Sequence, residues 1–179
     1  MPIVLVRIDD RLIHGQVVVG WAQALRANHI IVVNDEIVKN DMQKFLFRMA
    51  TPTDINLSVL SVDEAAQKIK ERAFDDDTAM LLTKSPEDVY RIVKAGGRIP
   101  EVNIGGMHFA DDKIQLFDAI FVDKRDVEML EKIHGLNIEL EVRMVPTDSK
   151  KDVMKAIEEK FNRGRGRGEA QEGRNIDKP

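Results

Sequence analysis

The sequence predicts an α/β fold, a single three-layer α/β/α domain around a mostly parallel sheet of about seven strands. Short apolar runs alternate along the chain with longer segments of helical period. Most of the runs are rich in Val, Ile and Leu and carry few charges, as expected for strands covered on both faces. The length of 179 residues fits one such domain with a tail rather than two full-sized domains.

Seven apolar runs are strand candidates, and several helix signals lie between them. The runs are residues 3–8, 29–33, 55–60, 79–82, 101–104, 119–122 and 138–142. Ser61 with Glu64 forms a capping-box pattern ahead of one helix. Ser85 before Pro86 provides a cap and a first-turn proline for another, and Gly96-Gly97 is typical of that helix's end.

The last predicted helix covers about residues 150–161, with Val153, Ile157 and Phe161 on one stripe. After Phe161 the composition changes to Arg-Gly repeats with almost no apolar content. We therefore expect residues 1–161 to form the folded domain and residues 162–179 to be a disordered, solvated tail. The alternative, an Arg/Gly segment that contacts nucleic acid or acidic lipid, is weak at this length.

Charge and cysteine content exclude several classes of protein. The formal net charge is −4, and residues 163–179 hold five Lys or Arg and three Asp or Glu, which leaves the rest of the chain at −6. An acidic body does not favour nucleic acid as a partner. The chain has no cysteine, which excludes disulfides, thiolate metal sites and thiol nucleophiles.

Neither a metal nor a cofactor is expected. The four histidines lack metal-ligand spacing, and no glycine-rich nucleotide motif follows the first strand. No apolar stretch approaches the roughly 20 residues that span a bilayer, and the first residues lack the features of a signal peptide. The sequence thus predicts a soluble, cytoplasmic protein.

The densest group of reactive side chains follows the first predicted strand, in Arg7-Ile8-Asp9-Asp10-Arg11-Leu12-Ile13-His14-Gly15-Gln16. In a parallel α/β sheet, ligands bind in the loop after a strand's carboxyl end. The next helix aims its free N–H groups at that loop, which favours an anion there. The loop supplies the imidazole of His14, the guanidinium of Arg11 and the carboxylates of Asp9 and Asp10, and Gly15 lets the backbone approach closely.

These residue types suit the transient phosphorylation of a histidine. A neutral imidazole is a competent nucleophile near pH 7, and a neighbouring carboxylate can hold it in the reactive tautomer. Arg11 can pair with phosphate oxygens and spread charge in a loose transition state. The residues alone leave the alternative open that His14 is an ordinary surface or hydrogen-bonded histidine.

The segment from Val6 to Val17, with Trp21 after it, resembles the N-terminal signature of a known family. The family is the mannose/fructose/sorbose-type IIB component of the bacterial phosphoenolpyruvate-dependent sugar phosphotransferase system. Four later segments resemble parts of the same family in the expected order: IVVNDE at 31–36, RMATP at 48–52, VNIGGMH at 102–108 and EVRMVP at 141–146. The resemblance covers about residues 1–161.

The resemblance implies that His14 carries phosphate on Nδ1. It would receive the group from a phosphohistidine on a IIA protein or domain and pass it to a sugar bound by membrane-embedded IIC and IID components. Asp9 and Arg11 match the family's active-site aspartate and arginine, so we expect Arg11 to contact phosphate and Asp9 to orient the loop or the ring. We expect Asp10 to be a surface or loop-capping carboxylate and Trp21 to pack in the core.

Five further residues are candidates for the phosphate loop or the substrate-proximal face: Gly15, Gln16, Thr51, Gly105 and Gly106. Gly105 and Gly106 either contribute N–H groups to a phosphate nest or form a tight turn that needs positive φ. Thr51 either lines the same face or belongs to a plain loop. His108 follows the two glycines, and we assign it no catalytic role.

The predicted function is that of a phosphocarrier, a protein-Nπ-phosphohistidine–sugar phosphotransferase subunit of a sugar uptake system. The expected partners are a phosphorylated IIA protein and membrane IIC and IID components, met transiently at the inner face of the cell membrane through a partly basic patch near Arg7 and Arg11. The alternative is a regulatory or binding protein with the same fold that phosphorylates no sugar. A homodimer is compatible with the sequence, which does not set the oligomeric state.

Overall fold

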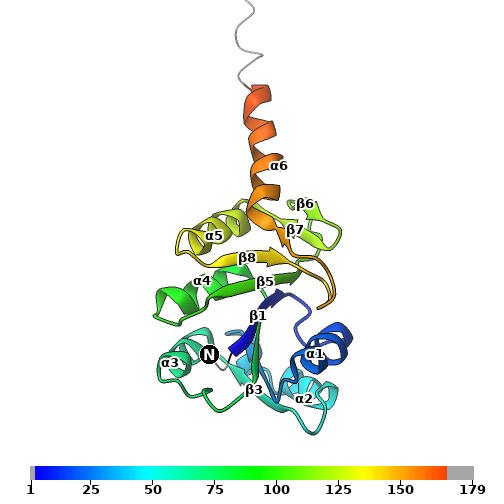
Figure 1. Cartoon of the computed structure of the whole chain (residues 1–179), viewed down its shortest axis with the longest axis vertical. Coiled ribbons are helices and arrows are strands. Elements are labelled where there is room, and N and C mark those ends of the chain that lie inside the picture. Colours follow the sequence, from blue (N-terminus) through cyan, green and yellow to red (C-terminus); the bar gives the residue numbers. More distant parts are fainter. Residues whose placement is uncertain (1–2, 169–179) are drawn as a thin grey trace, which may run out of the picture.

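The computed structural model describes residues 3–168, with side chains described as far as Phe161. Within this range the main sheet has seven strands in the order β3-β2-β4-β1-β5-β8-β9. The pairs from β3 to β8 are parallel, and β9 pairs antiparallel with β8. Figure 1 shows helices on both faces of this sheet, so the predicted α/β/α architecture is confirmed.

The strands are β1 (Ile3–Asp9), β2 (His29–Val33), β3 (Asn56–Leu60), β4 (Ala79–Thr83), β5 (Glu101–Gly106), β6 (Ile114–Phe117), β7 (Ile120–Val122), β8 (Glu139–Val142) and β9 (Lys151–Asp152). The helices are η1 (Gln16–Ala22), α1 (Gln23–Leu25), η2 (Ile37–Lys39), α2 (Asp41–Ala50), α3 (Val62–Lys70), α4 (Pro86–Lys94), α5 (Lys124–His134) and α6 (Val153–Gly168). The hydrogen bonds of η1 follow the wider π spacing and continue without a break into α1.

Local sequence signals account for most of these boundaries. The Ser61 side chain caps α3 and Glu64 completes the predicted capping box. The Ser85 side chain accepts a hydrogen bond from the backbone at the start of α4, whose first residue is Pro86. Gly96 follows α4 with a φ of 98°, a conformation that favours glycine.

The sheet separates two apolar layers. On one face, η1, α1 and α2 cover β2 and β4, with Val17, Trp21 and Phe47 buried in that layer. On the other face, α3, α4, α5 and α6 cover the sheet with residues such as Ile92 and Leu130. Strands β2 and β4 lie between the layers and are buried at every residue, which explains why their sequences are continuous apolar runs.

One of the seven predicted strands is not where the prediction put it. The run at 119–122 does form a strand, β7, but β7 pairs antiparallel with β6 in a separate two-stranded sheet. The seventh strand of the main sheet is the two-residue β9, which follows β8 and adds an edge. An apolar run shows that a segment is extended and buried, but it does not show which strand will be its partner.

The final helix is longer than the apolar stripe that predicts it. Helix α6 runs from Val153 to Gly168 and points away from the rest of the chain in Figure 1. The first part of the segment expected to be disordered, residues 162–168, is therefore helical, because the backbone pattern continues past the last apolar side chain at Phe161. The remainder of the predicted tail, residues 169–179, lies outside the described residues.

The order of the strands places one loop in a special position. Strands β1 and β4 are neighbours in the middle of the sheet. The connection from the carboxyl end of β1 leads toward β2, whereas the connection from β4 leads the opposite way to β5. This reversal is a topological switch point, the place where α/β sheets bind ligands. The loop that contains His14 leaves the sheet there.

Candidate active site

The loop that carries His14 is short and held by the core. It follows Asp9, the last residue of β1, and ends at Gly15, which precedes η1. The backbone N–H of Leu12 donates to the carbonyl of Asp9 at 2.9 Å, which closes a turn. Leu12 has a φ of 56° and is buried in the apolar layer beneath the loop. A non-glycine residue in this region is strained, and the burial of its side chain keeps the loop in this conformation.

The imidazole of His14 is fixed through one of its two nitrogens. Nε2 lies 3.0 Å from Oδ2 of Asp9, and 18% of the His14 side chain is exposed. An ionised carboxylate only accepts hydrogen bonds, so Nε2 carries the proton in this pair. In the neutral ring, Nδ1 then holds the free lone pair, and Nδ1 is the nucleophilic atom.

Asp9 is fully buried, yet it is surrounded by donors. Besides His14, its carboxylate accepts from Nη2 of Arg7 at 2.9 Å and from Nε and Nη2 of Arg11 at 3.1 and 3.2 Å. Burial alone raises the pKa of this carboxyl group. The hydrogen bonds from His14 and Arg11 and the charge of Arg7 outweigh burial and hold its pKa well below the usual value. Asp9 is therefore a permanent anion behind the imidazole.

Arg11 lies at the surface end of this group. Its side chain is 37% exposed, and besides its bonds to Asp9 it donates from Nη2 to the Gln16 side-chain oxygen at 3.2 Å. Nη1 of Arg11 donates no hydrogen bond to any of the described residues. Arg11 thus has a free donor beside His14, and Gln16 acts through Arg11 by helping to place its guanidinium.

Arg7 lies beneath Asp9 and corrects one prediction. The sequence suggested a basic docking patch that included Arg7, but Arg7 is fully buried and cannot meet a partner. Its Nη1 donates to the Asn103 side chain and to the carbonyl of Arg143, and its Nη2 also approaches the carbonyl of Met144 at 3.4 Å. Alternation along β1 points Arg7 and Asp9 to the same side of the sheet, which explains why they meet.

A tryptophan and a second ion pair complete the surroundings of Arg7. Trp21 of η1 lies close to two guanidinium groups, with its ring centre 5.4 Å from the guanidinium of Arg7 and 5.1 Å from that of Arg143. Its indole N–H donates to the carbonyl of Met144 at 3.1 Å. Arg143 pairs with Glu141 at 2.8 Å. Trp21 is buried as predicted, and it also holds the segment after β8 in place.

The two glycines of the GGM segment lie against charged side chains of β1, and their proximity to phosphate stays a prediction. Gly105 and Gly106 are residues of β5, and neither has positive φ, so they form neither the tight turn nor the αR-αL geometry of a nest. A Cβ on Gly105 would overlap the guanidinium of Arg7. A Cβ on Gly106 would lie 2.9 Å from Oδ1 of Asp9. The glycines make room for the charged side chains of β1.

The remaining candidates differ in their position relative to His14. Gly15 adjoins His14, and a Cβ placed on it would meet no atom within 4 Å, so the space above it is open to an incoming group. Thr51 is buried at the end of α2, where its hydroxyl donates to the carbonyl of Phe47 at 2.7 Å. This bond favours the structural alternative for Thr51, and its proximity to substrate stays a prediction.

Asp10 and His108 link two loops at the edge of the site. The Asp10 carboxylate accepts the backbone N–H of His108 at 2.8 Å and also pairs with Nδ1 of that residue. This carboxylate thus binds the backbone of another loop, 98 residues along the chain, and within the described residues it makes no bond that caps its own loop. His108 is about half exposed, and the pair ties the segment after β5 to the loop of His14.

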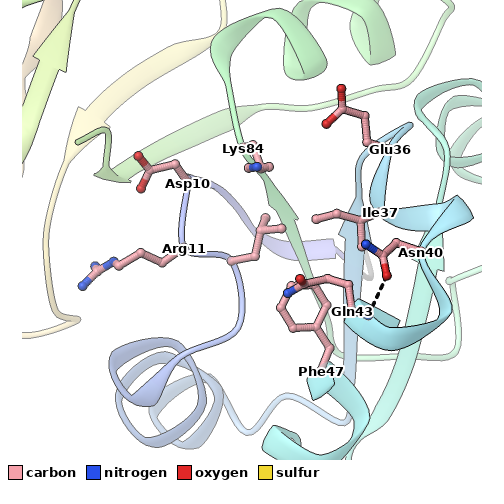
Figure 2. A pocket seen from close by; sticks show the side chains of 9 residues that line it. Asp10, Arg11, Glu36, Ile37, Asn40, Gln43, Phe47 and Lys84 are labelled. Atoms are coloured by element: carbon pink, nitrogen blue, oxygen red, sulfur yellow. Dashed lines mark hydrogen bonds between the residues drawn. The ribbon is translucent and has the colours of Figure 1, made fainter. Parts of the chain in front are cut away.

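A hollow of about 250 Å³ lies on the other side of that loop, at the topological switch point. It is lined by Asp10, Arg11, Leu12, Glu36, Ile37, Asn40, Gln43, Phe47 and Lys84. Figure 2 shows that the Arg11 side chain leads away from this hollow, while Ile37, Gln43 and Phe47 border it opposite the loop. Within the described residues, no three His, Cys, Asp or Glu side chains gather as metal ligands would.

Sequence reasoning missed the buried part of the site. Arg7 was read as a surface residue, and Asn103 and Glu141 were noted only as parts of motifs. One signal was available, because a charged residue at an inward position of a central strand must find a buried partner. The partners come from β5 and the end of β8, and no local pattern indicates that these segments meet.

The matching family model is described as PTS system sorbose subfamily IIB component, and it covers residues 3–165. The chain belongs to this family. The fructose-specific EIIB component of Bacillus subtilis is 35% identical over 157 residues, which cover 88% of this chain and 96% of that protein. The sorbose-specific EIIB component of Klebsiella pneumoniae is 34% identical over 159 residues, with 89% and 97% covered.

The mannose-specific EIIAB component of Escherichia coli is 40% identical over 157 residues, which cover 88% of this chain and 49% of that protein. Among solved structures, the IIBSor domain of the Klebsiella pneumoniae sorbose permease matches with a TM-score of 0.84 and 34% identity, covering 89% of this chain and 98% of that domain. The predicted resemblance is confirmed. The chain is a IIB component of a sugar phosphotransferase system, and its role is that of a phosphotransferase subunit in sugar uptake.

These matches do not favour the alternative of a purely regulatory protein. No helix in the described part of the chain combines the length and the apolar character that a membrane span requires.

Proposed function

We propose that His14 accepts a phosphoryl group on Nδ1 from the phosphohistidine of a IIA protein and then passes it to a sugar. The observation that carries the proposal is the 3.0 Å contact between Nε2 of His14 and the buried carboxylate of Asp9. It occupies Nε2 and leaves Nδ1 as the nucleophile, next to a free donor on Arg11.

The transfer step balances without a cofactor. The lone pair of Nδ1 attacks phosphorus in line, and the P–N bond of the donor breaks with its electron pair returning to the donor's imidazole. The His14 ring keeps its proton on Nε2 and becomes a phosphorylated imidazolium. Asp9 stabilises this positive ring, as the buried aspartate of a Ser-His-Asp triad stabilises its imidazolium. The P–N bond to a cationic ring remains labile, which suits passing the group on.

Arg11 supplies the electrostatic part of the step. Three equatorial oxygens carry the charge of the transferred group, and a guanidinium forms strong, often bidentate, bonds to such oxygens. The first turn of the helix after Gly15 adds few free donors, because the backbone N–H groups of Val17 and Val18 both donate to the carbonyl of His14 at 3.0 Å. Gln16 positions Arg11 through their contact at 3.2 Å.

The partners follow from the same proposal. A IIA protein or domain supplies the phosphoryl group, and membrane IIC and IID components present the sugar, so the chain works in the cytoplasm and at the inner face of the membrane. The reaction is that of a protein-Nπ-phosphohistidine–sugar phosphotransferase of the mannose/fructose/sorbose type. The named specificities of the relatives include fructose, sorbose, mannose and N-acetylgalactosamine, and the sugar here is among those that such membrane components carry.

Labelled phosphoenolpyruvate, the general phosphotransferase proteins and a IIA protein test the proposal. Wild-type protein should acquire acid-labile, alkali-stable label, and His14→Ala should acquire none. Equal labelling of the two proteins would refute the role of His14. Membranes with the cognate IIC and IID components and a panel of hexoses then decide whether label reaches sugar, and label that stays on the protein would favour a regulatory role.

A further inference from the structure

The acceptor histidine is positioned by a series of side-chain contacts that runs from His14 through Asp9 to the buried Arg7. Asp9 holds His14, and Arg7 holds Asp9 from below with Nη2 at 2.9 Å. Arg11 holds the same carboxylate from the solvent side, at 3.1 and 3.2 Å. The two arginines thus bind the same carboxylate, Arg7 from the buried side and Arg11 from the solvent side.

The ion pairs that Arg7 and Arg11 form with Asp9 are not equivalent during phosphotransfer. Arg11 is the only one of the two that can reach an incoming phosphoryl group, because Arg7 is fully buried. Bonds from Arg11 to the phosphoryl oxygens compete with its bonds to Asp9. The bond from Arg7 then keeps the carboxylate in the orientation that places the proton on Nε2 of His14.

Arg7 is itself locked by groups from three other parts of the chain. The Asn103 side chain and the carbonyl of Arg143 accept from Nη1, and Trp21 covers one face of the guanidinium. Gly105 leaves room for this group, since a Cβ there would overlap it. A guanidinium with this many fixed partners cannot follow Arg11 outward.

A contribution to folding stability alone does not explain why Arg7 and Asp9 are buried as an ion pair. A buried ion pair often contributes no more than well-packed apolar side chains of the same volume, because both charges lose their hydration. Apart from Arg7 and its partner Asp9, β1 is apolar at its buried positions Leu5, Val6 and Ile8, so an apolar pair at positions 7 and 9 would suit the sheet. The chemistry, by contrast, needs an ionised carboxylate that stays in place behind the imidazole.

We propose that Arg7 is a positioning residue for phosphotransfer: it keeps Asp9, and through Asp9 the ring of His14, in the acceptor geometry while Arg11 engages the phosphoryl group. The inference rests on the proposed function of His14. It adds Asn103 and Gly105 as the residues that fix Arg7, and it assigns the segment after β8 to the scaffold of the site.

Three variants of the full chain test the role of Arg7. Arg7→Met keeps most of the side-chain stem and removes the charge and the donors. Arg7→Lys keeps the charge but cannot reach all the acceptors at once. Gly105→Ala keeps Arg7 and places a methyl group where the guanidinium lies. Ile133→Ala, a fully buried position of α5, is the control for a loss of stability without contact with the network.

Two readouts separate positioning from folding. Long-range ¹⁵N NMR on the free protein reports which nitrogen of His14 carries the proton, and the Nε2–H form should predominate in wild type and fall at least twofold in Arg7→Met and Gly105→Ala. Single-turnover labelling by a phosphorylated IIA protein should show kcat lowered about tenfold to hundredfold. The KM for IIA should stay within about twofold, because a buried residue adds no contact to the donor. Arg7→Lys should lie between wild type and Arg7→Met.

The outcomes are decisive in both directions. Wild-type kcat and tautomer in Arg7→Met, or an equal loss of kcat in Ile133→Ala at the same folded fraction, would overturn the proposal. If Arg7→Met does not fold, Arg7→Lys and Gly105→Ala carry the test with the same expectations. If wild type takes no label from IIA, the proposed function fails, and the NMR comparison still decides whether Arg7 sets the state of His14.

Discussion

At the scale of single residues, the chemistry of His14 depends on charged side chains that differ in their exposure to solvent. Asp9 and Arg7 are removed from solvent, so their interaction is little screened and their geometry is fixed. Arg11 is partly exposed and free to change partners. A site that must receive and release a dianionic group within one cycle needs both kinds of group, a rigid one to hold the nucleophile and a mobile one to follow the phosphate.

Arg11→Ala should accept phosphate about 100-fold more slowly than wild type, the usual cost of removing one preorganised donor to a charged transition state. Asp9 retains Arg7 and His14 as partners, so the fold should persist. The measurement is single-turnover labelling with rapid quenching. Arg125→Ala, at an exposed position of α5, is the matched control, and an equal slowing of that variant would argue for a general charge effect.

Asp9 should make stability depend on pH in acid. Its pKa is lowered in the folded protein, so its contribution is complete above the unfolded value of about 3.9 and is lost as pH falls toward the folded value. Asp9→Asn breaks the buried pairs, at a cost of about 3 kcal/mol at pH 7, and should lose less stability than wild type between about pH 4 and pH 2. Urea unfolding over this range checks it. The assignment would be contradicted if wild type and Asp9→Asn lost unfolding free energy at the same rate as pH falls. It would also be contradicted if the exposed variant Asp118→Asn showed the same reduced loss as Asp9→Asn.

At the scale of elements, the site is made where strand ends meet. The sequence predicted the loop after β1 and its acidic and basic residues, because reactive side chains after a central strand are a local pattern. It did not predict that Gly105 serves Arg7, because this depends on β1 and β5 pairing with Arg7 opposite Asn103. Residues nearly a hundred positions apart become neighbours only through sheet register, and register is not written in either strand alone.

Helix α2 was not among the predicted elements, and it separates core from surface within ten residues. Its Phe47 is buried against the sheet and borders the hollow, whereas Phe45 and Met49 on another face are 60% and 70% exposed. Phe47→Ala should cost about 3–5 kcal/mol of unfolding free energy because it leaves a cavity. The double variant Phe45→Ser/Met49→Gln should change it by less than about 1 kcal/mol. Chemical denaturation compares the two, and equal losses would mean that the exposed stripe is part of the core.

At the scale of the whole molecule, alternating apolar runs and helix caps were enough to predict the three layers. Six of the seven predicted strands take their places in the main sheet. The exceptions have physical causes. Strand β9 is two polar residues that extend only because β8 offers an edge, and β7 pairs with β6 across the two-residue turn at Asp118 and Ala119. Short or edge pairings depend on what is nearby, so composition does not reveal them.

The boundary of the folded unit can be tested by truncation. Among the residues of α6 whose side chains the structure describes, four pack against the body: Val153, Met154, Ile157 and Phe161. A chain that ends at Phe161 should therefore keep the layers, the buried network and the loop of His14. Its melting temperature should lie within about 3 °C of wild type, a shift of under about 1 kcal/mol, and it should accept phosphate from IIA at the wild-type rate. Scanning calorimetry and the labelling assay measure both. A chain that ends before Val153 is the control and should unfold, because β8 and β6 lose their cover. A large drop in the melting temperature or in the labelling rate of the chain that ends at Phe161 would show that residues 162–179 belong to the functional unit.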